Sequence, residues 1–214
     1  MIVQAFIPDW PGPKQHAVEI NDVVSMRYPT KILNDPSDYF NAQWNKACQQ
    51  FTGNILLWVM SDIKLPKNFF RMCDEMERLM AREDIGWYAP DVAWTSYIYD
   101  KESLPIVEPE VCEVPNTDSL LFAVRADVIK EMPFIDPGIC FMWGMDVLAS
   151  TTIRLMGLKM IRDYRFKAEH PNNTGYDIGR ASTDMGRLFK SLAPQYKDEV
   201  LKTIDQINEM KRTP

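Results

Sequence analysis

Residues 54–66 read NILLWVMSDIKLP, and this stretch decides the fold. The apolar residues Ile55 to Met60 follow one another without a break, which is typical of a strand buried on both faces of a parallel sheet. The run ends at a small residue, Ser61, and a carboxylate, Asp62. In open α/β sheets, ligands bind in the crevice beyond the carboxyl ends of the strands. Asp62 is therefore either a ligand for a metal that holds phosphates or a helix cap.

Segments with the features of strands and helices alternate along the rest of the chain. Strands are predicted at residues 2–7, 31–35, 55–60, 85–89, 119–124 and 160–166. Helices are predicted at residues 16–26, 38–50, 68–82, 126–131, 143–156 and, interrupted by Pro194, 182–210. Residues 91–111 are predicted to be irregular. This order predicts an α/β fold with a mostly parallel central sheet and helices on both faces. Residues 1–180 form the predicted domain, and residues 181–214 a helical segment packed on it.

Composition places the chain among globular proteins. It has 214 residues, of which 46% are hydrophobic and 25% charged, enough for one domain with a full core. The longest apolar run is too short to cross a bilayer, and the N-terminal residues lack the pattern of a signal peptide. None of the four cysteines lies in a CxxC pair, which favours reduced thiols over a disulfide or zinc framework. We therefore expect a cytoplasmic protein without a membrane segment.

Charge is unevenly distributed. The net charge is −6, but residues 1–153 carry 12 basic against 22 acidic side chains, and residues 154–214 carry 12 against 8. Five basic residues lie between Arg154 and Lys167. Such asymmetry indicates either contact with a polyanion or an ordinary solvated surface.

Three further observations concern chemistry. Asp62 and His170 follow predicted strands, and Asp146 lies at the start of a predicted helix. Taken singly, each has a structural explanation, such as a helix cap, a carboxylate at a helix dipole or an isolated histidine. The chain has no GxGxxG motif and no P-loop lysine motif, so a dinucleotide-binding fold and a nucleoside triphosphatase are not supported.

Taken together, these residues resemble a known family. Met60-Ser61-Asp62 stands where the GT-A glycosyltransferases, most closely the family 2-like members, carry a DxD motif at the end of a strand. Residues 7–9 (IPD) resemble the end of their first strand, where the base docks, and residues 33–35 (LND) the end of their second. Residues 44–46 (WNK) stand at their Arg-Asn pair, residues 143–146 (WGMD) resemble the motif of the catalytic base, and residues 169–170 (EH) the late metal-binding histidine. The resemblance covers roughly residues 2–176.

The resemblance implies an inverting, metal-dependent glycosyltransferase that moves a hexosyl or pentosyl group from a nucleotide-diphosphate donor. It implies Asp62 and His170 as ligands of Mn²⁺ or Mg²⁺, and Asp146 as the base that takes the proton of the acceptor hydroxyl. Trp143 and Gly144 would contact the acceptor. The residues implied for the donor are Pro8, Asp9, Asp35, Asn45, Ser61, Tyr176 and Arg180.

The sequence also departs from the family pattern. Met60 replaces the first acid of the DxD motif, Trp44 the arginine before Asn45, and Asn34 the acid before Asp35. The loss at Met60 motivates an alternative from another class, a non-catalytic GT-A-like protein that binds nucleotide sugars or acts as a scaffold. A nucleotidyltransferase is a third option, but residues 11–14 (PGPK) are a poor match to its glycine-rich loop. No motif identifies the acceptor, and nucleic acid, as in a phage-type enzyme acting on modified DNA bases, is one candidate.

Overall fold

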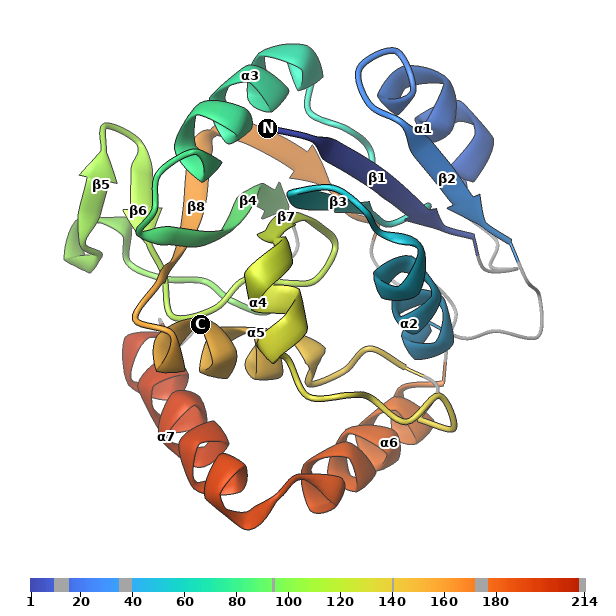
Figure 1. The fold of residues 1–214 in the computed structure, drawn as a ribbon. Helices are drawn as coiled ribbons and strands as arrows, with labels where there is room; N and C mark the ends of the chain where they lie inside the picture. Colours follow the sequence, from blue (N-terminus) through green and yellow to red (C-terminus); the bar gives the residue numbers. More distant parts are fainter. Residues whose placement is uncertain (10–15, 35–39, 94, 140, 172–176, 212–214) are drawn as a thin grey trace.

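The structure is a computed structural model that describes residues 1–9, 16–34, 40–93, 95–139, 141–171 and 177–211. Within these residues, one sheet of eight strands runs through the molecule, and helices cover both of its faces (Figure 1). The fold is therefore the α/β arrangement that the sequence predicts. None of the described helices is both long and apolar enough to cross a membrane.

The strands are β1 (Val3–Pro8), β2 (Thr30–Leu33), β3 (Ile55–Val59), β4 (Ile85–Ala93), β5 (Ile106–Glu108), β6 (Val111–Glu113), β7 (Leu121–Arg125) and β8 (Lys159–Glu169). Their order across the sheet is β2-β1-β3-β7-β4-β8-β6-β5. Strands β2, β1, β3, β4 and β8 run in one direction, whereas β7 runs against its neighbours β3 and β4. The carboxyl ends of the co-directional strands therefore meet at one edge, together with the amino end of β7.

The helices divide between two layers. Helices α1 (Ala17–Val24) and α3 (Phe69–Met80) pack on one face. The other face carries α2 (Phe40–Gln50), α4 (Ala126–Glu131), α5 (Met145–Leu155), α6 (Ile178–Ser191) and α7 (Pro194–Met210). Pro194 begins α7 at a position where its missing N–H breaks no helical hydrogen bond. The expected boundary between residues 180 and 181 lies in the first turn of α6.

Strand β3 shows why the run of apolar residues is needed. Ile55, Leu57 and Val59 point to the layer of α1 and α3, whereas Leu56 and Trp58 point to the layer of α2 and α5. All five side chains are buried. Burial of each large apolar side chain stabilises the fold by about 1.5–3 kcal/mol, so both helical layers depend on this strand.

The segment from Asp91 to Val111 is more regular than predicted. Strand β4 continues to Ala93, a 3-10 turn spans Lys101–Ser103, and β5 and β6 form an antiparallel hairpin beside β8. Its tight turn holds Glu110 at a left-handed φ of 65°. The hairpin strands are only three residues long and each ends in a glutamate, so they are too short to show the alternating apolar pattern on which sequence prediction depends.

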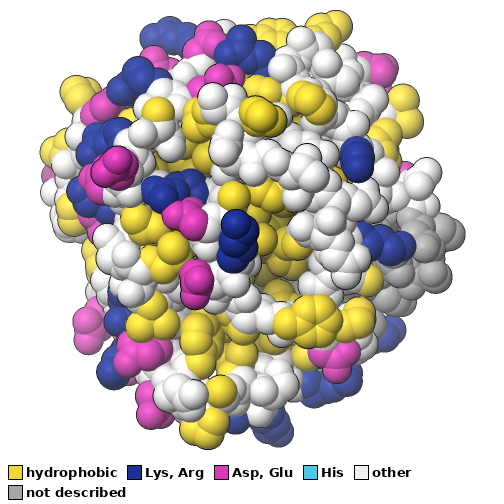
Figure 2. All heavy atoms as spheres, in the orientation of Figure 1, with side chains coloured by type: hydrophobic (Ala, Val, Ile, Leu, Met, Phe, Trp, Pro, Cys, Tyr) yellow, Lys and Arg dark blue, Asp and Glu magenta, His cyan; other side chains and the backbone are white. Residues whose placement is uncertain are grey.

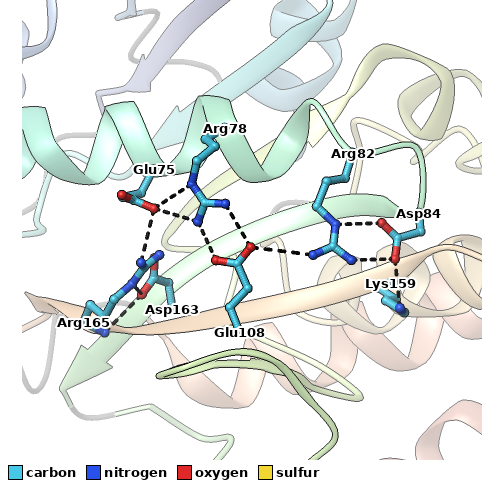
Figure 3. Close-up of polar contacts among 8 residues, drawn as sticks. All are labelled: Glu75, Arg78, Arg82, Asp84, Glu108, Lys159, Asp163 and Arg165. Atoms are coloured by element: carbon cyan, nitrogen blue, oxygen red, sulfur yellow. Dashed lines mark hydrogen bonds and ion pairs between the residues drawn. The ribbon is translucent and has the colours of Figure 1, made fainter.

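A row of paired charges joins this hairpin to α3, to the turn between α3 and β4, and to β8 (Figure 3). Arg78 of α3 binds Glu75 and, on the hairpin, Glu108. The row, which we call the charge ladder, consists of Glu75, Arg78, Arg82, Asp84, Glu108, Lys159, Asp163 and Arg165. The charge ladder connects the β5–β6 hairpin to the sheet through ion pairs, on the face opposite α5.

Candidate active site

A cavity of about 360 Å³ lies at the edge where the co-directional strands end. Its wall combines polar side chains from distant parts of the chain with the apolar side chains of the α5 layer. The side chains in this wall that could take part in ligand binding or proton transfer are those of Asp62, Tyr97, Asp118, Trp143, Asp146 and His170. The sheet topology explains their meeting: residues 62, 97 and 170 follow β3, β4 and β8, and residue 118 precedes the reversed strand β7.

Asp62 and His170 form a close pair. Nε2 of His170 lies 3.2 Å from Oδ2 of Asp62. A short antiparallel bridge fixes this approach, because the N–H groups of Lys64 and Glu169 each donate to the other residue's carbonyl, at 2.8 and 3.1 Å. The ends of β3 and β8 are thus joined directly beside the pair, although β3 and β8 are not neighbours in the sheet.

The Asp62–His170 pair fits one side of a divalent metal site. Asp62 is 4% exposed, and its Oδ1 atom is buried without a hydrogen-bond partner among the described residues. Ligand atoms at about 2.1 Å from an octahedral ion lie about 3 Å apart, close to the separation of Oδ2 and Nε2. No described group of three His, Cys, Asp or Glu residues could hold a metal. A metal here would therefore need further ligands, such as phosphate oxygens.

Asp146 lies in the first turn of α5 and is held by three donors. Its Oδ1 accepts from the Val147 N–H at 3.0 Å, and its Oδ2 accepts from the Tyr97 hydroxyl and from Nδ2 of Asn116, the latter at 3.4 Å. The hydroxyl of Ser150 donates to Oδ1 of Asn116 at 2.6 Å, which turns the amide nitrogen toward Asp146. Burial outweighs these hydrogen bonds and raises the pKa of Asp146 to about 6. A carboxylate with this pKa can accept a proton near neutral pH.

The turn before α5 requires a glycine. Gly144 caps the helix with a φ of +90°, a left-handed conformation that favours glycine. A Cβ atom there would also lie 3.1 Å from the ring of Phe189 and 3.2 Å from the side chain of Met185. This close approach of α6 places Trp143 and Asp146 in the cavity wall, on either side of the glycine.

Two cavity residues were not found by sequence reasoning. Oδ2 of Asp118 accepts from the Thr95 hydroxyl and from the Ser96 N–H, at 3.2 Å for the latter. Burial raises the pKa of Asp118. Tyr97 donates to Asp146, and burial raises the pKa of its phenol, so it stays protonated as a donor. Both residues lie in irregular segments without a motif, and only the reversed direction of β7 brings Asp118 to this edge.

Three of the residues expected at the donor, Pro8, Asp9 and Ser61, lie at or after the ends of β1 and β3. Pro8 is the buried end of β1, and Asp9 follows it with its pKa raised by burial. Ser61 is buried, and its carbonyl accepts from the His16 N–H at 2.6 Å. None of these three is among the described residues that line the cavity.

Asn45 and Arg180 lie on helices at the cavity's flank. Nδ2 of Asn45 donates to the carbonyl of Ile135 at 2.8 Å, so its amide supports the loop before α5. The guanidinium of Arg180, an exposed residue of α6, lies 6.0 Å from the ring of Phe141, which lines the cavity. Asp35 and Tyr176, the other two residues expected at the donor, lie outside the described residues.

Met60, which replaces the first acid of the DxD motif, lines the cavity as well. Its Sδ atom accepts from the indole nitrogen of Trp58 at 3.3 Å. Trp44 packs edge-on against the same indole, with ring centroids 5.4 Å apart. These contacts place Trp44 in the core and leave Met60 as an apolar patch next to Asp62.

No family model and no curated protein sequence matches the chain. Solved structures do match its fold. GalNAc-T7, solved with UDP, GalNAc and Mn²⁺, superposes with a TM-score of 0.62 at 12% identity, covering 92% of this chain and 49% of that one. Glucosyl-3-phosphoglycerate synthase from Mycobacterium tuberculosis, with Mn²⁺, UDP-glucose and phosphoglyceric acid, gives 0.58 at 11% identity, covering 99% and 81%.

A third match is the mannosyltransferase PcManGT from Pyrobaculum calidifontis, solved with GDP-mannose and Mn²⁺. It gives a TM-score of 0.57 at 13% identity, and the match covers 96% of this chain and 69% of that one. The chain thus spans about half of GalNAc-T7 and larger shares of the other two structures. At these identities the likeness concerns the fold, and the chain has the GT-A fold of the nucleotide-sugar glycosyltransferases.

Proposed function

We propose that the protein is a metal-dependent glycosyltransferase that moves a sugar from a nucleotide-diphosphate donor to an acceptor hydroxyl. The observation that carries this proposal is a single cavity whose wall holds both the Asp62–His170 pair and Asp146 with its pKa near 6. A pair suited to a metal and a carboxylate suited to proton transfer are the two parts that this chemistry requires. Solved structures of the same fold contain Mn²⁺ and nucleotides or nucleotide sugars, which supports the proposal.

Asp62 and His170 would hold the divalent ion, and the donor phosphates would complete its coordination. The ion, when bound, supplies Lewis-acid stabilisation of the negative charge that develops on the leaving diphosphate. The Asp62 carboxylate and the donor phosphates would supply oxygen ligands, which suit Mg²⁺ or Mn²⁺. The imidazole of His170 favours Mn²⁺. The Oδ1 atom of Asp62, which has no hydrogen-bond partner among the described residues, is available to bind such a cation.

Asp146 would act on the acceptor. Its Oδ atom accepts the proton of the acceptor hydroxyl while that oxygen forms a bond to the anomeric carbon. The bond from this carbon to the diphosphate oxygen breaks, and the electron pair leaves with the nucleoside diphosphate. One base and one displacement give inversion at the anomeric carbon. Tyr97 and Asn116 orient the carboxylate for this step.

Several finer assignments from the sequence remain part of the proposal. Arg180 is assigned to the donor diphosphate, because its guanidinium lies next to the cavity residue Phe141. Residues 1–180 are assigned to the transferase domain, with residues 181–214 packed on it, and the contact between α5 and α7 supports this packing. A cytoplasmic location is supported by the free thiols of the three described cysteines, Cys48, Cys73 and Cys112.

The basic residues between 154 and 167 give little support to a nucleic-acid acceptor. Arg154 pairs with Glu199, and Lys159 and Arg165 belong to the charge ladder. Arg162 is 4% exposed and donates to the carbonyl of Tyr97 at 2.8 Å. On the face shown in Figure 2, Lys and Arg side chains are interspersed with Asp and Glu. A dominant basic surface, as DNA binding requires, is not present on that face.

The second candidate is a non-catalytic protein that binds nucleotide sugars. The observation in its favour is Met60, whose apolar side chain lines the cavity where an acid would contact the ribose in the family pattern. This candidate predicts donor binding without turnover. The glycosyltransferase proposal predicts both.

A panel of nucleotide sugars tests both candidates. The melting temperature of the protein is measured with UDP-, GDP-, dTDP- and CDP-linked sugars, with and without Mn²⁺, and release of nucleoside diphosphate is measured in parallel. Stabilisation that requires both ligands, together with slow release of the diphosphate, supports the enzyme. Stabilisation without any release supports the binding protein. If no nucleotide sugar raises the melting temperature in Mn²⁺, the donor site is refuted.

A further inference from the structure

The charged side chains of the cavity wall are nearly all of one sign. Its described residues include three carboxylates and one imidazole, and they include no lysine or arginine. In the proposed function, the metal ion neutralises much of the donor diphosphate beside Asp62 and His170. Asp118 and Asp146 then remain as the charges that face an acceptor. The buried Oδ1 atom of Asp62, which has no partner among the described residues, is a separate sign that the cavity is built for a ligand.

Asp118 has one oxygen engaged and one available. Oδ2 accepts from Thr95 and Ser96, whereas no described residue donates to Oδ1. The side chain is held in place by these two bonds while it lines the cavity. An immobilised carboxylate with a free oxygen is suited to accept a hydrogen bond from a ligand hydroxyl, and such charge-assisted bonds are among the stronger ones.

Asp118 and Asp146 are linked through one short segment. Thr95 binds Asp118, and its Oγ1 also accepts from the Tyr97 N–H at 3.0 Å. The Tyr97 hydroxyl in turn binds Asp146. Arg162 also holds this segment by donating to the Tyr97 carbonyl, and its charge partly offsets the effect of burial on the pKa of Asp118. Both carboxylates are thus fixed in one wall, where a single molecule can contact them together.

The remaining wall is suited to a ring with an apolar face. Trp143 lines the cavity beside Asp146, and the ring of Tyr97 and the side chain of Val147 border the same space. Aromatic rings pack against the C–H faces of sugars, while the carboxylates bind hydroxyls at the ring edge.

We propose that the acceptor is an uncharged molecule with neighbouring hydroxyl groups, such as a sugar ring. Asp118 binds one hydroxyl through Oδ1, and Asp146 takes the proton from the hydroxyl beside it. This inference rests on the proposed function and specifies its substrate class. Acceptors that carry a phosphate are expected to be disfavoured by on the order of 100-fold, because the added anion would enter a cavity whose described wall includes three carboxylates and no lysine or arginine.

The test compares matched acceptors on the full-length protein. A donor that binds with Mn²⁺ is incubated with methyl glycosides of glucose, galactose and mannose, with the corresponding sugar 6-phosphates, and with a single-stranded oligonucleotide. Mass spectrometry then measures how much of the donor sugar is transferred to each. Transfer to neutral sugars at least 100-fold above transfer to the phosphates is the expected result. Equal or greater transfer to the phosphates or the oligonucleotide, or transfer to none of the panel, would overturn the inference.

Variants locate the effect at Asp118. Asp118→Asn is expected to raise KM for the neutral acceptor 10- to 100-fold, because one charge-assisted hydrogen bond is lost, while kcat changes less than about threefold. The variant is also expected to lower the ratio of transfer to neutral sugars over transfer to sugar phosphates. Asp205→Asn, on the exposed side of α7, removes a carboxylate of the same kind and should change neither value. An unchanged KM in a folded Asp118→Asn protein would count against the assignment.

The Mn²⁺-dependent shift in melting temperature distinguishes a failure of the acceptor inference from a failure of the proposed function. It reports donor binding in every variant and does not depend on the acceptor. A protein that binds and hydrolyses the donor but prefers anionic acceptors keeps the proposed function and loses this inference. A protein without any Mn²⁺-dependent donor binding loses both.

Discussion

The charge ladder and the cavity both contain several carboxylates, but the groups that bind these carboxylates differ between the two regions. In the ladder every acid lies within ion-pair distance of a base, as Glu108 does with Arg78. In the cavity, Asp118 and Asp146 face each other's charge, and only hydroxyl and N–H groups bind them. Pairing lowers the pKa of Glu75 and Glu108, whereas burial raises the pKa of Asp118 and of Asp146. Asp118 and Asp146, which form no ion pair with a described base, therefore lie in the cavity wall, whereas the ion-paired carboxylates connect the hairpin to α3 and β8.

Removal of the base should produce the largest effect. Asp146→Asn is expected to lower kcat by about 10²–10⁴-fold, the usual contribution of a general base, because the amide cannot take the acceptor proton. Donor binding should persist, since the metal pair is untouched. Release of nucleoside diphosphate with saturating acceptor measures the first effect, and the Mn²⁺-dependent melting shift the second. Activity near that of the wild type would refute the assignment of Asp146.

Loss of a metal ligand should instead abolish the metal-dependent part of donor binding. A donor at about 100 times its Kd stabilises the fold by about 2.7 kcal/mol, which raises the melting temperature of a domain of this size by roughly 5–10 °C. Asp62→Ala is expected to remove this shift. His170→Ala should weaken it, because phosphate and carboxylate oxygens remain as ligands. Glu169→Ala, next to His170 but exposed, serves as the control and should keep the full shift.

The contributions of the cavity and of the charge ladder to the free energy of unfolding should change with pH in opposite directions. The pKa of Asp146 rises from its usual 3.8 to about 6 on folding, so its ionisation costs stability above pH 6, by up to ~3 kcal/mol, and the cost disappears as pH falls toward 4. Glu75 and Glu108 of the ladder have lowered pKa values, so their contribution is present above pH 4 and is lost at lower pH.

Urea unfolding at pH 4, 5, 6 and 7 checks this comparison. Asp146→Asn should match the wild type at pH 4 and become the more stable protein between pH 5 and 7. Activity should change in the opposite sense, with kcat/KM falling about tenfold per pH unit below pH 6 because the base is protonated. A variant that is less stable than the wild type at pH 7 would show that the burial cost of Asp146 is already compensated.

The comparison also shows which features the sequence could predict. Asp62 and His170 were found because each lies within a few residues of the end of a predicted strand, and co-directional strands end at one edge whatever their order. The first turn of α5 was found from its Gly-Met-Asp pattern. Asp118 was not found, because it reaches the cavity only if β7 runs backwards between β3 and β4, and strand direction leaves no local pattern in the sequence.

The role of a polar side chain on a helix is a second feature that the sequence does not reveal. Asn45 resembles a donor-binding residue by position, yet in the structure its amide donates to Ile135, and Asn41, one turn earlier, donates to Ile139 and Phe141. Both amides support the loop that leads into α5. An asparagine on a helix has the same sequence signal whether it binds a loop or a ligand, so only the tertiary contact distinguishes these two roles.

Breaking the ladder should produce the smallest effect. Arg78 binds Glu75 and Glu108, but its side chain is 49% exposed, so solvent screens both pairs. Arg78→Ala is expected to lower the free energy of unfolding by about 1 kcal/mol or less in low salt and by less in 1 M salt, where ion pairs are screened. Arg71→Ala removes an exposed arginine of the same helix, α3, and serves as the control in urea unfolding. Donor binding and transfer should be unchanged in both variants, because the ladder lies away from the cavity wall. A loss of transfer in a stable Arg78→Ala protein would mean that the hairpin's fastening also sets the geometry of β8 at His170, and the two regions would then be coupled through that strand.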